Sequence, residues 1–182
     1  MACVLTTGRK VPCKSAVGGI KTIYFADFGT LGDATIASGE ITAFSGTPSW
    51  FQFDVKGNSS LETAINSSRE NGTTFYESTL NLTLTFQDKA TQEELKLIAH
   101  ARPHIAIEDY NGNYFVMGLE HGADVNGGTI VTGAAMGDLS GYTLTLTAME
   151  KLPANFLAYT DNGDGTWTVG TSTVTIEEGT NS

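Results

Sequence analysis

Long apolar runs are absent from this chain. No hydrophobic stretch approaches the roughly 20 residues that a membrane-spanning helix requires, and residues 1–19 lack the apolar centre of a secretory signal. The hydrophobic content of 40% still suits a folded domain rather than a disordered chain. We therefore expect a protein with no membrane association that is made and folded in a cytoplasm.

Residues that bind metals are scarce as well. The two cysteines, Cys3 and Cys13, are too few for a disulfide framework or a four-cysteine zinc site, so we expect free thiols. His100 and His104 have the spacing of a metal-binding pair on a helix, but a proline between them ends that helix, and His121 stands apart. We expect no metal and no other cofactor.

No catalytic set stands out either. The segment 160–167, TDNGDGTW, resembles a calcium-binding loop, but glycines occupy positions that need oxygen ligands. A glycine-rich hairpin turn explains the same residues more simply. Because no nucleophile, base and acid occur in a recognised arrangement, we expect that the protein is not an enzyme.

Basic residues are outnumbered by 20 acidic to 10, and the net charge is −10. The imbalance grows along the chain, because residues 101–182 carry 10 acids and 2 bases. Nucleic acids are bound mainly through Lys and Arg on phosphates, so general DNA binding is excluded. An acidic surface could instead let DNA slide past without binding.

The residues that are abundant predict β-structure. Threonine and other β-branched residues alternate with apolar ones in many short segments separated by glycine, proline and asparagine. In 49–57, Trp50 alternates with Phe51 and Phe53, so we place Trp50 on the face opposite to the phenylalanines and outside the simple core. Strands are expected at 20–27, 34–44 with a bulge or a close backbone approach at Gly39, 49–57, 59–66, 73–87, 104–122, 122–137 and 140–151.

Two of these segments are predicted to be hairpins. Asn111-Gly112 in 104–122 favours a type I′ turn, because both residues readily adopt positive φ. The segment 122–137 is expected to turn at Asn126, Gly127 and Gly128.

One amphipathic helix is expected, at about 91–102. Thr91 and Glu94 have the spacing of a capping box, and Pro103 ends the helix. Its apolar face is formed by Leu95, Ile98 and Ala99.

A polar arm is predicted between residues 57 and 80, too polar to belong to the core. Its turn lies at Arg69–Gly72, and the strand 73–87 is long enough for part of it to protrude. We expect the arm to make an inter-subunit contact through its tip, where Arg69 and Glu70 could form salt bridges. The predicted contact residues are Ser67, Ser68, Arg69, Glu70 and Asn71. A mobile hairpin without a partner remains the alternative.

These elements together predict a mainly β fold. There is no strand–helix alternation, so a β-sandwich or barrel with one flanking α-helix and a long protruding hairpin or loop fits best. We expect a β domain at 1–158 and a C-terminal hairpin extension or flexible tail at 159–182, where a hairpin about NGDG precedes a further strand.

Residues 1–158 also resemble a known family. The resemblance rests on NSSRENGTTFYESTLNLTLTF (66–86) followed by ATQEELKLIAHARPHIAIEDYNGNYFVMGLEHGADVNGGTIVTGAAMGDLSGYTLTLTAMEKLPANFL (90–157). This order of strand, arm, strand, helix, NG hairpin and glycine-rich final strand is similar to that of the tail tube proteins of tailed bacteriophages.

The resemblance implies a structural virion protein rather than an enzyme. Such a protein self-assembles into homohexameric rings that stack head to tail around a DNA channel, with the strands of neighbours joined into an inner barrel and a long hairpin bridging to the next ring. Its partners would be copies of itself, other phage tail proteins, and genomic DNA that passes through during ejection without specific binding. It would be assembled in the host bacterial cytoplasm and end in the virion tail.

Two alternatives stay open. Another virion ring component, such as a distal tail or neck protein, would form one ring and not polymerise. A carbohydrate- or host-binding β-sandwich module would need exposed aromatic side chains, for which Trp50, Trp167 and Tyr110 are the candidates.

Overall fold

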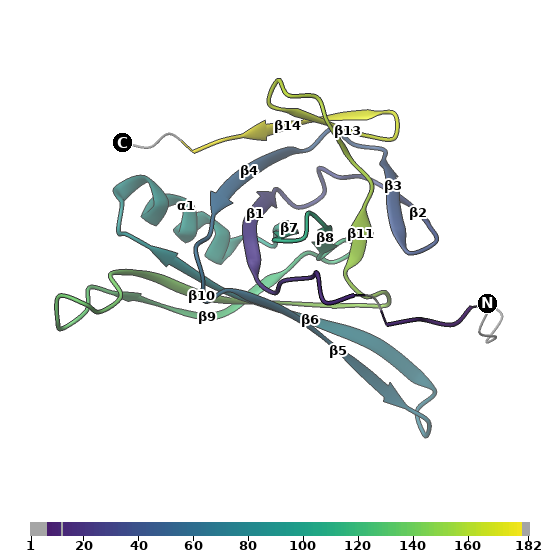
Figure 1. Ribbon diagram of the computed structural model, residues 1–182, viewed down its shortest axis with the longest axis horizontal. Helices are drawn as coiled ribbons and strands as arrows, with labels where there is room; N and C mark the ends of the chain where they lie inside the picture. The colour runs from purple at the N-terminus through teal and green to yellow at the C-terminus, as the bar shows by residue number, and fades with distance from the viewer. Residues whose placement is uncertain (1–6, 12, 180–182) are drawn as a thin grey trace.

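The structure is a computed structural model that describes residues 7–11 and 13–179. It contains one helix and fourteen strands in the described residues (Figure 1). The elements are β1 (Ile20–Ala26), β2 (Ala34–Ala37), β3 (Glu40–Phe44), β4 (Ser49–Asp54), β5 (Ser60–Ser68), β6 (Thr73–Thr85), α1 (Lys89–His100), β7 (His104–Asp109), β8 (Tyr114–Met117), β9 (Asp124–Val131), β10 (Gly141–Glu150), β11 (Asn155–Leu157), β12 (Thr160–Asp161), β13 (Thr166–Val169) and β14 (Ser172–Glu177).

The strands form two sheets. The large sheet has the order β12-β13-β14-β4-β1-β7-β8-β11-β3-β2, and the small sheet has the order β5-β6-β10-β9. Figure 1 shows the small sheet below the large one, with α1 beside them. The predicted fold class, mainly β with two sheets and one flanking helix, is confirmed.

A first hydrophobic cluster fills the space between the two sheets. From Leu80 onward in β6 and along β10, every second residue points into it, as the period-2 alternation predicts. These residues are Leu80, Leu82, Leu84, Tyr142, Leu144 and Leu146, and they pack with Ile23, Phe25, Ile105 and Ile107 of the large sheet. The threonines between the leucines are left on the outer face of the small sheet.

The large sheet curls around a second cluster. Its two ends meet where β13 contacts β3, and the Ser172 hydroxyl donates to the carbonyl of Phe44. β1 has both faces covered, because Ile23 faces the first cluster and Tyr24 the second. Trp50 lies in the second cluster at 0% exposure, so its predicted position outside the core is wrong.

The helix α1 packs on the first cluster through Leu95 and Ile98. It begins earlier than predicted, because Asp88 is its N-cap and accepts a hydrogen bond from the backbone N–H of Thr91. Thr91 is therefore inside the helix, and the predicted capping box is wrong. Ala99, expected on the apolar face, is exposed.

The predicted NG hairpin is confirmed, but its turn type is not. Gly112 has a φ of 78°, whereas Asn111 does not adopt positive φ, so the loop is not type I′. A two-residue loop with positive φ at both positions lies instead at Ser38 (φ 56°) and Gly39 (φ 85°), between β2 and β3. The predicted bulge at Gly39 is therefore a hairpin turn.

The predicted turn at Asn126–Gly128 is wrong, because these residues lie inside β9. Gly128 sits opposite Leu144, where a Cβ would come within 2.5 Å of the carbonyl oxygen of Thr143. Glycine is thus required there by a close backbone approach and not by a turn. The connection to β10 follows β9 and is held by Asp138, which accepts from the N–H groups of Ala134 and Ala135.

The C-terminal segment forms the predicted hairpin and following strand. β14 pairs in parallel with β4, and Trp167 is 5% exposed in the second cluster. The division of the chain at residue 158 stays a prediction. Among the described residues no helix is long and apolar enough to cross a membrane.

Candidate assembly surfaces

The two edge strands of the small sheet are long and unblocked. Within the described residues β5 and β9 each pair with one strand only, and they are 9 and 8 residues long. The edge strands of the large sheet, β2 and β12, have only 4 and 2 residues. Short edges are one way in which proteins avoid unwanted pairing. The large sheet has short edge strands, whereas the edge strands of the small sheet are long.

Other protective devices are also rare on these edges. Proteins block edge strands with lysine, proline or bulges. The sequences of β5 (SLETAINSS) and β9 (DVNGGTIV) contain neither lysine, arginine nor proline. β9 has one irregularity, beside Asn126, and is regular from Gly127 to Val131. Both edges therefore offer backbone groups to another strand.

The outer face of the small sheet is polar, with acidic residues and no base. Hydroxyl and amide side chains bond across its strands, for example Thr129 with Thr143 (2.6 Å), Asn126 with Thr147 (2.6 Å) and Thr145 with Asn81 (3.1 Å). By register, the charged residues at outward positions are Glu62, Glu77 and Asp124. Such a face would not bind phosphates.

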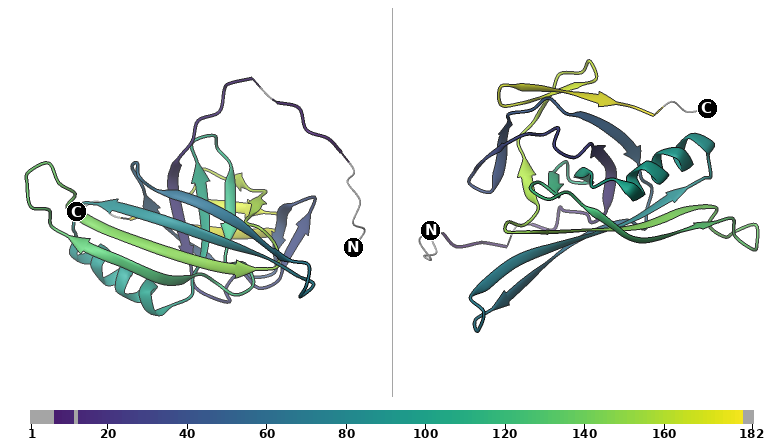
Figure 2. Two further views of the ribbon diagram at one scale, coloured as in Figure 1. Left: turned by 90° about the horizontal axis from the view of Figure 1, so that it is seen from below. Right: turned by 180° about the vertical axis from the view of Figure 1, so that it is seen from behind.

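The distal part of the β5–β6 hairpin extends away from the body of the molecule (Figure 1, and Figure 2, right). Ser67 and Thr74 share a hydroxyl–hydroxyl hydrogen bond of 3.0 Å, and the Ser68 hydroxyl accepts from the N–H of Asn71 at 3.3 Å. Arg69 and Glu70 are exposed at the tip. The ion pairs among the described residues are Lys21–Glu108 and His121–Glu120, so within residues 7–11 and 13–179 the tip charges have no ion-pair partner. An inter-subunit role for the tip stays a prediction.

Two apolar side chains on this hairpin escaped the sequence reasoning. Ile65 is 69% exposed and Phe75 is 39% exposed. By register they lie on opposite faces, since Ile65 pairs with Tyr76 and Phe75 pairs with Asn66. The sequence could have indicated them, because both residues are apolar within a segment that was predicted to be a polar arm.

A groove runs beside β5, between the two sheets. Its volume is about 480 Å³. Leu61 and Thr63 of β5 form one wall, Ile107 and Phe115 of the large sheet form another, and Pro153 lies at the rim. On the β9 side of the sandwich the corresponding space is filled by α1, which contacts β9. The space between the sheets is thus filled by α1 beside β9 and left open by the groove beside β5.

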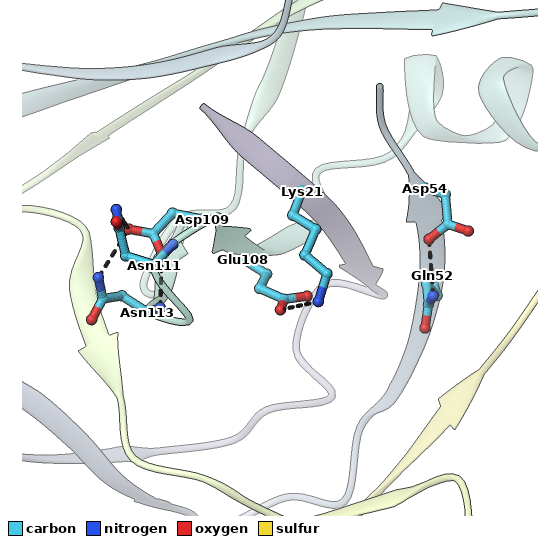
Figure 3. A network of polar contacts seen from close by, with 7 residues as sticks. All are labelled: Lys21, Gln52, Asp54, Glu108, Asp109, Asn111 and Asn113. Carbon is cyan, nitrogen blue, oxygen red and sulfur yellow. Dashed lines mark hydrogen bonds and ion pairs between the residues drawn. The ribbon is translucent and has the colours of Figure 1, made fainter. Parts of the chain in front are cut away.

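The β7–β8 turn next to this groove is tightly braced (Figure 3). The Asp109 carboxylate accepts from the backbone N–H groups of Asn111 and Asn113, both at 2.8 Å. Burial acts to raise the pKa of Asp109, but the bonds from Asn113 and Asn111 outweigh it and lower that pKa. The Asn111 side chain also clamps the backbone of Val17, accepting from its N–H at 2.9 Å and donating to its carbonyl at 2.7 Å. The N-terminal segment therefore leaves the body at a fixed point.

The aromatic platform that the alternative carbohydrate-binding function would need is not formed by the candidate residues. Trp50 and Trp167 are 0% and 5% exposed, whereas Tyr110 is 48% exposed. Trp167 stacks edge-on with Tyr24 and Tyr114 inside the second cluster. Two of the three candidates are core residues, and a binding platform needs exposed rings.

The histidines take structural or surface positions. His104 is 3% exposed, accepts from the Gly29 N–H at Nε2 (2.9 Å) and donates from Nδ1 to the Gly118 carbonyl (2.6 Å). Burial lowers the pKa of His104, although its bond to Gly118 opposes this. His100 and His121 are exposed. Within residues 7–11 and 13–179 no three metal-ligating side chains gather.

The segment that resembles a calcium loop is a turn closed by its own side chains. Asp161 accepts from the N–H of Gly163 at 2.9 Å, and Asp164 accepts from the N–H of Thr166 at 3.1 Å. Both carboxylates thus accept hydrogen bonds from the backbone, as the hairpin interpretation predicts.

Comparison of the chain with protein-family models, curated proteins and solved structures finds no match in any of the three.

Proposed function

We propose that this protein is a structural virion subunit that self-assembles into stacked hexameric rings, which form the tail tube of a tailed bacteriophage. The observation that carries the proposal is the small sheet with two long, unblocked edges at its opposite sides. An isolated chain of this kind leaves both edges open to pairing, and a closed ring of copies satisfies both at once.

The strand directions suit such a ring. Neighbours in the order β5-β6-β10-β9 are all antiparallel, so β5 and β9 run in opposite directions. Rotation about a ring axis preserves strand direction, so β9 of one copy meets β5 of the next in antiparallel orientation. The alternation therefore continues around the ring without a mismatch.

The outer face of the small sheet supports a conduit role. If the joined sheets line the channel, DNA meets threonine and asparagine side chains with the carboxylates of Glu62, Glu77 and Asp124, and no base. Without Lys or Arg on the phosphates, no counterions are released and DNA can pass during ejection without binding. The β5–β6 hairpin, with its exposed tip residues Ser67–Asn71, bridges to the adjacent ring in this proposal.

Negative-stain electron microscopy of the concentrated, purified protein tests the proposal. Tubes or stacks of six-fold rings are expected. Single rings that never stack would favour a distal tail or neck component instead. A monodisperse monomer at high concentration, measured by light scattering, would contradict both assembly proposals.

A further inference from the structure

We propose that Ile130 of one copy packs into the groove beside β5 of the next copy, opposite Leu61. This lateral joint rests on the proposed function, because it specifies how the edges of neighbouring small sheets meet. It adds the residue contact, the strand register and the occupant of the groove.

The face on which Ile130 must lie follows from register. Ile130 is opposite Tyr142 in the β9–β10 ladder, and Tyr142 is buried on the inner face of the sheet. Leu61 is opposite Leu80, which is also buried on the inner face. Side chains of directly paired residues share a face. Any in-register pairing of β9 with a neighbour's β5 therefore places Ile130 on the same face as Leu61 and Thr63, which is the groove side.

Exposure supports this placement. Ile130 is 61% exposed although it lies on the face that its own sheet buries, since no further strand covers it at the β9 edge. The groove wall formed by Leu61 and Thr63 is only partly covered as well. The open flank of one copy and the uncovered isoleucine of another are complementary, and burial of apolar surface favours their contact.

The stagger of the sheet selects the register. Ala64, the middle of β5, lies level with Met149 of β10 through Glu77, whereas Gly127 of β9 is opposite Thr145. Pairing Ala64 with Gly127 of the next copy thus shifts the strands by one residue for each strand crossed. With about 3.3 Å per residue and roughly 4.8 Å between strands, this tilts the strands by about 35° from the ring axis. Closed barrels tilt their strands by about 35–45°.

In this register Leu61 faces Ile130 of the next copy, and Glu62 faces its Thr129 on the outer side. A shift of one residue would turn every side chain to the wrong face. The groove is therefore filled by a second copy of this chain rather than by a small ligand, since one of its walls is the edge strand β5, whose side away from β6 can accept another strand.

Cysteine cross-linking in assembled tubes tests the joint. In a Cys3→Ser, Cys13→Ser background, the Leu61→Cys, Ile130→Cys pair should form covalent chains of up to six subunits on oxidation. Within one copy the two positions lie on opposite edges of the sheet, three strand spacings apart and offset by four residues along the strands, which is roughly 20 Å and too far for a disulfide. The control pair, Leu61→Cys with Thr129→Cys, places the second thiol on the other face and should give no ladder.

The outcomes separate the joint from the function. Tubes in which the control pair cross-links as well as the test pair, or in which neither does, would overturn the joint and leave the proposed function standing. Absence of any assembly, with or without the cysteines, would overturn both. As a second measurement, Ile130→Asn should abolish tubes without changing the melting temperature of the monomer, while Ile130→Val should retain them. Tubes formed by Ile130→Asn would also overturn the joint.

Discussion

Ile130 and Tyr142 lie directly opposite each other across the β9–β10 ladder, yet Tyr142 is 1% exposed and Ile130 is 61% exposed. The same face of one sheet thus passes from core to solvent within a single strand spacing. Tyr142 is covered by α1 and the first cluster, and its hydroxyl donates to the carbonyl of Asp88 at 3.0 Å. The buried core of the sandwich therefore ends before the β9 edge of the small sheet. This is what we expect of a protomer that is completed by a neighbouring copy.

The ion pair of Lys21 and Glu108 gives a first prediction about the fold. The two groups are 2.7 Å apart, with side chains 55% and 9% exposed (Figure 3). The hydrogen bond to Glu108 raises the pKa of Lys21. Lys21→Met leaves a nearly buried carboxylate without its partner, and we expect a loss of about 1–2 kcal/mol in the free energy of unfolding, discounted for the exposed lysine. Urea denaturation at pH 7 measures it.

A double-mutant cycle with Glu108→Gln separates pairing from burial. The Lys21→Met, Glu108→Gln variant should recover part of the loss, because the unpaired charge is then gone. A fully additive loss in the double variant would show that the two residues do not interact.

His104 makes stability depend on pH. Its neutral form is required, since Nε2 accepts from Gly29 and Nδ1 donates to Gly118. Burial lowers the pKa of His104 below its ordinary value, so the unfolded chain binds the proton more readily. The contribution of His104 is therefore fully present above about pH 6.5 and is lost as the pH falls below it. The Phe28 ring stacks on the His104 ring and, with the Arg102 guanidinium 5.3 Å from the Phe28 ring centroid, forms part of its surroundings.

Urea unfolding at pH 8 and pH 5.5 checks this expectation against a His104→Gln variant. The wild type should lose more stability than the variant between the two values. The comparison with the variant is needed because burial raises the pKa of Glu150. A carboxyl group with a raised pKa makes the folded state more stable as the pH falls, which is opposite to the effect of His104. Equal losses of unfolding free energy in both proteins would show that protonation of His104 does not change the stability of the fold.

The C-terminal strands should contribute to global stability. Trp167 is 5% exposed and contacts Tyr24, Tyr114 and Tyr159 inside the curled sheet. We expect Trp167→Ala to cost roughly 3–5 kcal/mol, as for other large aromatic residues in a core. Thr173→Ala, at an exposed position of the next strand, should stay within about 0.5 kcal/mol. If Trp167→Ala melted at the wild-type temperature, residues 159–179 would be an appendage independent of the domain.

Local alternation predicted β6 and β10 of the small sheet well, because these two strands have one buried face and one open face. It failed for Trp50, because β4 lies in a sheet whose two faces contact different clusters, with Phe53 toward the first and Trp50 toward the second. Period-2 alternation separates the faces of a strand but does not say how many of them are buried.

Turns were predicted less reliably for a related reason. Asn126-Gly127-Gly128 has the composition of a turn, but Gly128 serves the close approach of β9 to β10, which is a tertiary contact that composition does not reveal. Likewise, Asp88 and Thr91 are both good N-cap residues, and the geometry of the β6–α1 connection selected Asp88. The groove beside β5 was beyond reach from the sequence, since its walls come from segments as distant as Leu61, Ile107 and Pro153.

The last prediction concerns the β5–β6 hairpin. Replacing residues 67–74 by Asn-Gly keeps the rung between Asn66 and Phe75 and closes it with a two-residue type I′ turn. Because the removed residues lie outside both hydrophobic clusters, the monomer should melt near the wild-type temperature. The proposed bridge to the next ring would be lost, so we expect rings that no longer stack into tubes. Electron microscopy with thermal unfolding measures both effects.

A length-preserving variant isolates the role of the charged tip in that experiment. Arg69→Ser with Glu70→Ser keeps the reach of the hairpin and removes its charges. Exposed ion pairs contribute only about 0–1 kcal/mol, so this variant should still form tubes, with weaker stacking that is most evident at low salt. Tubes of normal length from the shortened hairpin would remove its bridging role, whereas tubes from the length-preserving variant alone would assign the bridge to the backbone and uncharged side chains of residues 67–74, because the shortened hairpin retains Ile65 and Phe75.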